Sequence, residues 1–381
     1  MKTVQQPRWY RPAWIEIDLN QLRQNFALIH ADKPKPLRII SVIKDQAYGH
    51  GAVPVAKAAL ESGAAGLAVA TLEEGVVLRE GGIAAPILML GERHPNELRD
   101  CLHHRLTCSV SDVRIAKELA TSAEEAGTAA PVHLKIDTGM SRYGIRWNKA
   151  LPTIAEIASH RTLRLEGVMS HFAMSDETDK SFALEQLGRF QTVLAAMREK
   201  GFAVKYRHLC NTGGFLDLPQ AHFDQVRIGI LPLGVFPSAV CRRIAGIEPV
   251  MTVKAQIASI QNIEPGDTVG YGLRYRAPAP RRIGVLPIGY GDGFPRVRNQ
   301  GEVLVCGKRA PLVGSVAMDA ITIDITDIPE AQLWEEVVVM GRQGSEMISV
   351  HDMARLKNSV SYDVLAGWRE RLPKVFIGAS A

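Results

Sequence analysis

The sequence has few cysteines, and they are not spaced to cross-link the fold or to hold a metal. Among 381 residues there are five, an odd number with no Cys-x-x-Cys pair: Cys101, Cys108, Cys210, Cys241 and Cys306. Disulfide frameworks use even numbers of cysteines, and structural zinc sites use closely spaced pairs. The pattern argues against both, predicts no metal site, and favours a reducing compartment, here the cytoplasm.

Long apolar runs and blocks of one charge are also missing. Residues 1–14 contain no apolar signal-peptide core, and no uninterrupted apolar span reaches membrane length. The net charge of +5 is spread along the chain, without the Lys/Arg block of a nucleic-acid-binding arm. A hydrophobic content of 46% is that of a globular protein, and the length suits two domains. We expect no membrane and no nucleic-acid partner.

The region from Leu37 to about Ile230 alternates short β-rich runs with amphipathic helical stretches. Such alternation implies right-handed crossovers and a parallel sheet, and eight units are the number that closes a (β/α)8 barrel. A doubly wound open sheet usually has a Gly-rich loop after its first strand, whereas Lys44 stands there. The predicted strands are Leu37–Ile43, Ala65–Ala70, Pro86–Leu90, Leu106–Val110, Pro131–Ile136, Leu163–Met169, Val204–Leu209 and Gln225–Ile228.

The pattern changes after a Pro/Gly-rich passage at residues 230–249. Alternating or strand-like runs follow, together with one helical stretch near Val350–Lys357. The fold class is therefore α/β, with a TIM-type barrel at residues 14–245 and a mostly β domain at residues 246–381, against which residues 1–13 would pack. The predicted C-terminal strands lie in Met251–Ile263, Arg282–Ile288, Val303–Cys306, Ala320–Asp327 and Glu336–Met340.

The apolar strand Ile39–Ile43 carries Lys44 at its carboxyl end, shortly before Tyr48 and a glycine turn. Partial burial lowers the pKa of a lysine, which is how enzymes prepare an amine to react with a carbonyl. A surface lysine that closes a strand is the alternative from this segment alone.

Other polar residues also follow the predicted strands, where barrel enzymes hold their chemistry. Each has a structural alternative, such as an ordinary turn, a core histidine, or mutual neutralisation of Lys135 and Asp137. Barrels commonly bind phosphate in the loops after strands seven and eight, so a lysine facing these loops predicts pyridoxal phosphate held as an imine. The segments are Lys135–Arg142, Ser170–Phe172, Asn211–Gly214 and Arg227–Ile230.

A series of segments in one order resembles the alanine racemase family, whose members use pyridoxal phosphate to interconvert L- and D-alanine. The series covers nearly the whole chain, which makes it far more specific than any single motif. Its segments are Trp14–Leu19, Lys44–Gly51, His133–Met140 with Arg142, Val226–Ile230, Val269–Gly272, Pro287–Gly293 and Val316–Asp319.

The resemblance implies a homodimer with active sites at the subunit interface and a two-base mechanism on a small amino acid. Lys44 would hold the cofactor and serve one face of the substrate, and the partner subunit's Tyr271 would serve the other. Arg227 would contact the pyridine nitrogen and, being permanently charged, leave it unprotonated. The other implied residues are Tyr48, His171, Asn211, Thr212, Gly229 and Ile230 at the cofactor, Arg142, Met318 and Tyr290 at the substrate, and Lys135, a lysine often carbamylated in this family, with Asp319 in support.

Several residues depart from the usual pattern of the family, so the resemblance implies a racemase more firmly than it implies alanine. A racemase that prefers serine or another small amino acid is the first alternative. A pyridoxal-phosphate decarboxylase would place a carboxylate where Arg227 stands, and a cofactor-carrying homeostasis barrel would lack the β domain. The departures are Asp45, Gln46, Thr212, Leu231–Gly234, Ala317 and Glu370.

Overall fold

A computed structural model describes residues 11–379, so most of the segment predicted to pack with the C-terminal domain, residues 1–10, lies outside the described residues. Contacts divide the chain into two units. One unit comprises Leu22–Ala47 and Gly51–Glu248. The other contains the chain up to Gln21, Tyr48–His50 and the chain from Pro249 onward.

The first unit is a parallel barrel, in the order β10-β2-β3-β4-β5-β6-β8-β9, with the short β7 (Ile145–Arg146) beside β6. Backbone hydrogen bonds from Asp224 to Arg207 (3.1 Å) and from Arg227 to Cys210 (3.0 Å) join its two ends. The predicted barrel is confirmed. Its strands are β2 (Arg38–Val42), β3 (Gly66–Val69), β4 (Ile87–Met89), β5 (Thr107–Val110), β6 (Ala130–Asp137), β8 (Leu163–Met169), β9 (Tyr206–His208) and β10 (Gln225–Ile228).

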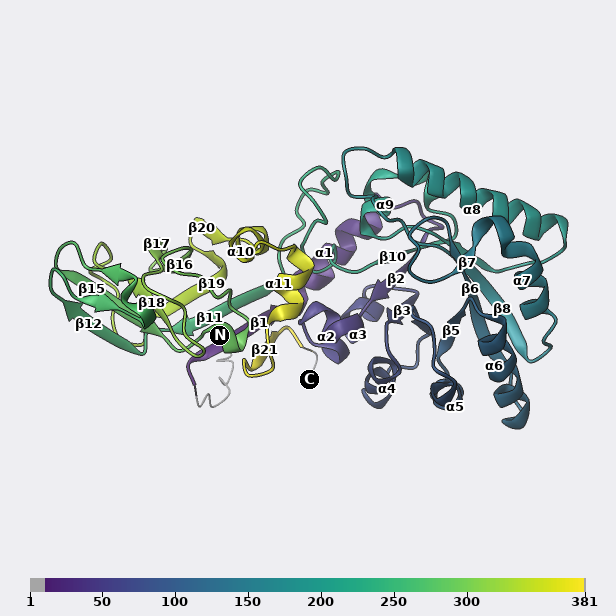
Figure 1. Cartoon of the computed structure of the whole chain (residues 1–381), viewed down its shortest axis with the longest axis horizontal. Helices are drawn as coiled ribbons and strands as arrows, with labels where there is room; N and C mark the ends of the chain where they lie inside the picture. The colour runs from purple at the N-terminus through teal and green to yellow at the C-terminus, as the bar shows by residue number, and fades with distance from the viewer. Residues whose placement is uncertain (1–10, 380–381) are drawn as a thin grey trace. The chain divides into compact units, whose positions relative to one another are not determined.

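Helices between the strands lie outside the barrel (Figure 1). In α6, the residues at positions 116, 119, 120 and 123 are buried, the spacing of a single helical stripe. Side chains start these helices, since Asp112 caps α6 and Thr71 forms a capping box with Glu74 at α4. The helices are α1 (Leu19–Asp32), α3 (Ala52–Glu61), α4 (Leu72–Glu80), α5 (Leu98–His103), α6 (Val113–Glu125), α7 (Ala150–Ala158), α8 (Ser181–Glu199) and α9 (Thr212–Asp217).

The second unit is mostly β, as predicted. One sheet has the order β17-β16-β19-β11-β1-β21, with β20 beside β19, and smaller sheets are β12-β15-β18 and β13-β14. Two helices, α10 (Val350–Lys357) and α11 (Ser361–Gly367), follow the strands. The strands are β1 (Ala13–Asp18), β11 (Met251–Gln256), β12 (Ser259–Ile263), β13 (Thr268–Val269), β14 (Tyr275–Arg276), β15 (Arg281–Leu286), β16 (Glu302–Val305), β17 (Lys308–Pro311), β18 (Ile321–Asp324), β19 (Glu336–Gln343), β20 (Glu346–Ile348) and β21 (Lys374–Ile377).

The segment that begins near Trp14 belongs to the β unit and not to the barrel. The prediction placed Trp14 at the start of the barrel, whereas β1 pairs antiparallel with β11 and parallel with β21 in the β unit. The alternating stretch Met251–Ile263 is not one strand either. It is divided into β11 and β12, which belong to different sheets. Both differences concern pairing between distant segments, which local alternation does not encode.

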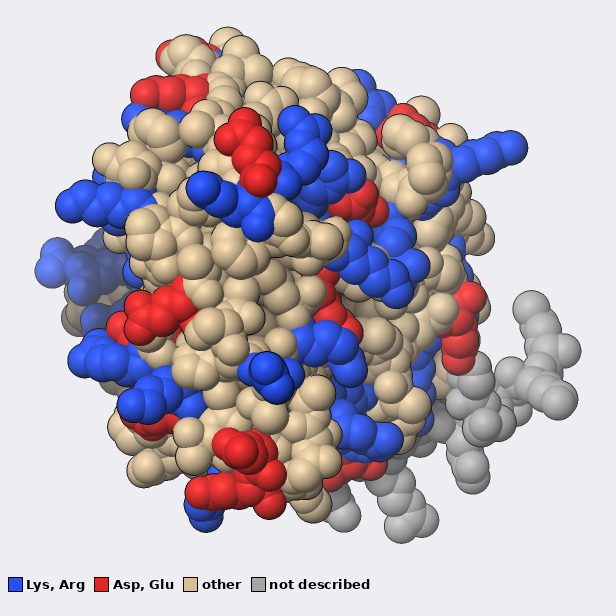
Figure 2. All heavy atoms as spheres, turned by 90° about the vertical axis from the view of Figure 1, so that its right-hand side faces the viewer, with Lys and Arg blue, Asp and Glu red and all other residues tan. Residues whose placement is uncertain are grey.

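The surface carries charges of both signs. Figure 2 shows Lys and Arg side chains interspersed with Asp and Glu side chains on the face it displays. Among the described residues, no helix has both the length and the apolar character needed to cross a membrane. Within residues 11–379, no group of three or more His, Cys, Asp or Glu side chains could hold a metal ion. All five cysteines are thiols.

Candidate active site

Lys44 follows the buried strand β2, two residues beyond its end. Its side chain is partly buried, and burial lowers the pKa of the amine, with a further lowering by the nearby charge of Arg142. Glu74 and Asp45 oppose this shift. A lowered pKa increases the share of neutral amine at a given pH, which is the form that reacts with a carbonyl.

The segment after Lys44 is a left-handed turn of four non-glycine residues. The φ angles of Asp45, Gln46, Ala47 and Tyr48 lie between 52° and 54°. This conformation costs about 1–2 kcal/mol for each residue with a Cβ atom. Glu74 holds the turn and the end of β3 together, because its carboxylate accepts from the backbone N–H of Asp45 (2.7 Å) and of Ala70 (2.7 Å).

Arg227, on β10, is buried and makes hydrogen bonds only to neutral acceptors among the described residues. One Nη donates to Nδ1 of His208 (2.8 Å). The other Nη donates to the Ser170 carbonyl (2.7 Å) and to Nδ1 of His171 (3.0 Å). With no carboxylate beside it, burial lowers the pKa of Arg227 to about 10, so the side chain remains a cation at neutral pH.

These hydrogen bonds fix the protons on the neighbouring histidines. An arginine can only donate, so Nδ1 of His208 accepts and its Nε2 carries the proton. That Nε2 lies 2.8 Å from Nδ1 of His133, which must therefore accept in turn. Burial lowers the pKa of all three histidines: His133 to about 4, and His171 and His208 well below their usual value. Arg227 thus faces neutral imidazoles.

Lys135 and Asp137, two residues apart on β6, do not neutralise each other. Asp137 pairs with Arg146 (2.7 Å), whereas Nζ of Lys135 donates to the Leu90 carbonyl (2.8 Å). Burial and the charges of Arg227 and Arg142 lower the pKa of Lys135 to about 8. The ordinary ion-pair explanation of this lysine is therefore wrong.

Arg142 and His171 lie at the same rim. They line one small cavity together with Lys135 and Ser170. The charges of Arg227, Arg142, Lys135 and Lys44 all depress the pKa of His171, which indicates that the predicted residues of the barrel lie near one another. Arg142 itself is exposed.

The loops after β9 and β10 meet around Thr212. Its hydroxyl accepts from the backbone N–H of Gly229 (3.4 Å), and it is buried, as is Ile230. Asn211 caps α9, since its side-chain oxygen accepts from the N–H of Gly214 (3.0 Å). A hydroxyl next to a glycine N–H is a suitable place for an anionic oxygen.

The remaining predicted residues belong to the β unit. Backbone hydrogen bonds hold the segment of Tyr290 beside that of Met318. The Tyr290 N–H donates to the Ala317 carbonyl (3.0 Å), and the Gly291 N–H donates to the Met318 carbonyl (2.7 Å). The Tyr271 carbonyl accepts from Ser315 (3.0 Å). Tyr271 and Tyr290 therefore both lie beside the segment 315–318, which contains Met318. Asp319 next to Met318 is exposed, and the buried Tyr48 has its ring 6.1 Å from that of Tyr362.

Sequence reasoning missed His208, His133 and Glu74 as parts of this site. The first two lie on barrel strands, where a histidine usually satisfies its hydrogen bonds in the core. One signal was available: His133 alternates with Lys135 and Asp137 on β6, so the three share a face. Glu74 gives no comparable signal, because it also completes the capping box of α4.

Two family models match the chain. The alanine racemase N-terminal domain covers residues 17–237, and the alanine racemase C-terminal domain covers residues 250–376. Among curated proteins, alanine racemase of Halothermothrix orenii is 38% identical over 96% of this chain and 97% of its own length. Alanine racemase of Syntrophobacter fumaroxidans is 40% identical over 92% of this chain and 94% of its own.

Solved structures are similar over nearly the full length. Alanine racemase of Clostridium difficile 630 superposes with a TM-score of 0.93 at 32% identity, covering 98% of both chains. Alanine racemase of Bacillus anthracis with bound L-Ala-P superposes with a TM-score of 0.91 at 34% identity, covering 97% of this chain and 96% of that one. The chain belongs to the alanine racemase family.

Proposed function

We propose that this protein is a pyridoxal-phosphate-dependent racemase that interconverts L- and D-alanine. The observation that carries the proposal is Arg227, a buried cation that contacts only neutral acceptors within the described residues. Such a group suits a pyridine nitrogen that accepts a hydrogen bond and is not protonated, since arginine keeps its own proton. A decarboxylase of related fold would have a carboxylate at this position.

The chain's residues fit the cofactor. Lys44 offers an amine with a lowered pKa, and the Thr212 hydroxyl, which accepts from the N–H of Gly229, has its own proton to donate to a phosphate. We assign Tyr48, Asn211 and Ile230 to the phosphate side and His171 to the ring. When bound, pyridoxal phosphate supplies an electron-withdrawing system that acidifies the α-proton of the amino acid.

Inversion at the α-carbon needs proton-transfer groups on both faces. Lys44 would remove or return the proton on one face, and the partner subunit's Tyr271 would do so on the other. Tyr271 is 78% exposed in the single chain, and the neighbouring Leu273 and Met318 are 65% and 54% exposed. Apolar side chains this exposed favour a protein interface, which supports a homodimer with active sites between the subunits.

Substrate binding would use groups from both subunits. Arg142 would attract the carboxylate of the amino acid, with the backbone of the partner subunit's Met318 as a second contact. Tyr290 would line the entrance. We assign to Lys135 and Asp319 the positioning of these groups. The thiol state of all five cysteines supports a cytoplasmic location.

A racemisation assay over a panel of small amino acids, with pyridoxal phosphate added, tests the function. We expect the highest kcat/KM with alanine, measured in both directions, and loss of turnover in the Lys44→Ala variant. Faster turnover of L-serine than of L-alanine would assign the chain to the first alternative. Decarboxylation without racemisation would overturn the proposal.

A further inference from the structure

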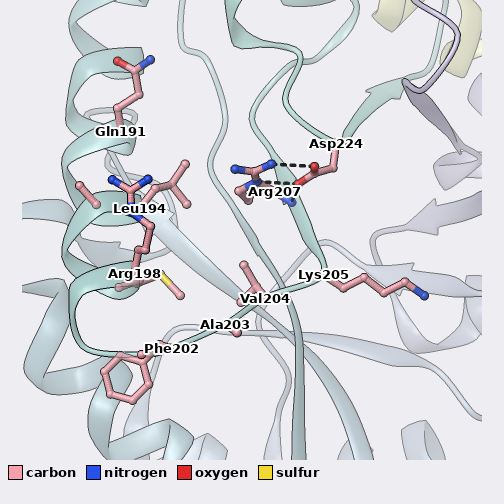
Figure 3. Close-up of a pocket in the computed structure, with 12 residues that line it drawn as sticks. Gln191, Leu194, Arg198, Phe202, Ala203, Val204, Lys205, Arg207 and Asp224 are labelled. Atoms are coloured by element: carbon pink, nitrogen blue, oxygen red, sulfur yellow. Dashed lines mark hydrogen bonds and ion pairs between the residues drawn. The ribbon is translucent and has the colours of Figure 1, made fainter.

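A cleft with a volume of about 400 Å3 lies between α8 and β9, outside the barrel. Figure 3 shows Gln191, Leu194 and Arg198 on the wall formed by α8, with Arg207 and Asp224 across from them. The segment that leads from α8 into β9 forms the rest of the cleft. A volume of this size is within the range of sites for small molecules.

The lining of the cleft is divided into an apolar and a polar part. The apolar part includes Leu194, Met197, Phe202 and Val204. Met197 is 2% exposed and belongs to the core beneath the cleft, whereas the other three are half-buried. A short hydrocarbon chain bound here would be shielded from water on several sides, which is favourable for apolar surface.

The polar part has two cations, Arg198 and Lys205, that form no ion pair in the described part of the chain, and the amine of Lys205 lies over the ring of Tyr206. Asp224 already accepts from the side chain of Arg207 through both of its oxygens, at 2.7 and 2.8 Å. No carboxylate in the described part of the chain lies within ion-pair distance of Arg198, which is exposed on the last turn of α8. The charge of the cleft is therefore complementary to an anion.

The cleft is separate from the candidate active site. Ala203, Val204 and Asp224 precede β9 and β10, so they lie at the amino ends of these strands. His208 and Arg227 lie toward the carboxyl ends of the same strands, where barrels hold their chemistry. A ligand in the cleft would not touch the residues assigned to the reaction.

We propose that this cleft binds an amphipathic monocarboxylate, with the carboxylate at Arg198 and an aliphatic tail against Leu194, Met197 and Val204. A single exposed ion pair contributes little, so most of the affinity comes from the tail. Each added methylene group should tighten binding about threefold to fourfold until the cleft is filled. Octanoate is then expected to bind about tenfold more tightly than hexanoate.

Methyl NMR of the full chain loaded with pyridoxal phosphate, labelled with 13C at the methionine methyl groups, tests the proposal. The Met197 signal is assigned by its loss in Met197→Leu. We expect a saturable shift of this signal with octanoate, weaker binding of hexanoate, and weaker binding of 1-octanol, which has the tail without the charge. A carboxylate at the candidate active site would shift other methionines instead.

Two variants separate the contributions of charge and cavity. Arg198→Glu should reduce the affinity for octanoate to that for 1-octanol or below, while Val204→Trp should fill the cleft and abolish the shift. Lys117→Glu, an equal charge change on the exposed side of α6, should leave binding unchanged. Absence of a Met197 shift, equal binding of octanoate and 1-octanol, or unchanged binding by Arg198→Glu would each overturn the proposal.

Discussion

At the scale of single residues, the neighbours of Arg227 determine what this cation can do. A buried charge is tolerated when its hydrogen bonds are satisfied, and His208, His171 and the Ser170 carbonyl do this without neutralising it. The sequence predicted Arg227 through its resemblance to a family. It predicted His171 in the same way, but not His208 and His133, because their role depends on three strands that meet only in the folded barrel.

The histidine network predicts a loss of stability in mild acid. The pKa of His133 falls from 6.5 to about 4 by burial. Between these values the unfolded chain binds a proton that the folded chain does not bind, so the free energy of unfolding decreases as the pH falls. In His133→Asn the amide oxygen can still accept the hydrogen bond from His208. The free energy of unfolding of this variant should depend less steeply on pH, by up to about 1.4 kcal/mol per pH unit.

Urea unfolding of the loaded protein between pH 7 and pH 4 measures this difference. His103→Asn, at an exposed position on α5, serves as the control and should keep the slope of the unaltered chain. A His133→Asn variant with the same slope would mean that His133 is protonated in the folded state, contrary to the arrangement of its hydrogen bonds.

Replacing Lys44 tests the cofactor assignment directly. Lys44→Ala should remove the visible absorption of bound pyridoxal phosphate and lower racemisation by at least about 10²- to 10⁴-fold, because it removes both the attachment point and one proton-transfer group. Lys33→Ala, a change in the loop after α1, should leave both unchanged. Retention of the absorption band by Lys44→Ala would assign the attachment to another lysine.

At the scale of elements, the local sequence was sufficient to predict the strands of the barrel but not the turn that follows the first of them. All eight predicted strands overlap the observed ones, since each is a short β-rich run that alternates with a helical stretch. The left-handed turn at Asp45–Tyr48 contains no glycine or asparagine, so turn chemistry does not reveal it. It depends on Glu74, which reaches Asp45 from the start of α4.

The hairpin between β16 and β17 offers a test of such turn chemistry. Val305 pairs with Lys308, which leaves Cys306 and Gly307 as a two-residue loop with φ angles of 52° and 74°. Positive φ at both positions is typical of a type I′ turn, which favours Asn-Gly. Cys306→Asn should therefore raise the free energy of unfolding by up to about 1 kcal/mol.

Gly307→Ala is the opposite change and should lower the free energy of unfolding by a similar amount. Both are measured by urea unfolding under reducing conditions, so that oxidation of the thiol does not contribute. A destabilised Cys306→Asn protein would indicate that the thiol packs better than the turn geometry suggests.

At the scale of the whole molecule, the ends of the chain belong to one unit. β1 pairs with β21, and Arg11 forms an ion pair with the buried carboxylate of Asp292 (2.6 Å), two residues after Tyr290. This closure brings together residues more than two hundred positions apart, which explains why the sequence did not predict it. The exposed side chains of Tyr271 and Met318 belong to the same unit, and the proposed homodimer would bring them to the barrel of the partner subunit.

Subunit exchange tests this assembly and the two-base mechanism together. Tyr271→Phe should lower racemisation by about 10²- to 10⁴-fold while cofactor binding and dimer formation persist, because only the phenolic hydroxyl is removed. Mixed in equal amounts with Lys44→Ala, it should form hybrid dimers in which one site has both groups and the other has neither. About half of the dimers would be hybrids, so about a quarter of the original activity should return. Each variant incubated with itself is the control. If mass spectrometry shows exchange and activity stays at the level of the single variants, Lys44 and Tyr271 do not meet across subunits.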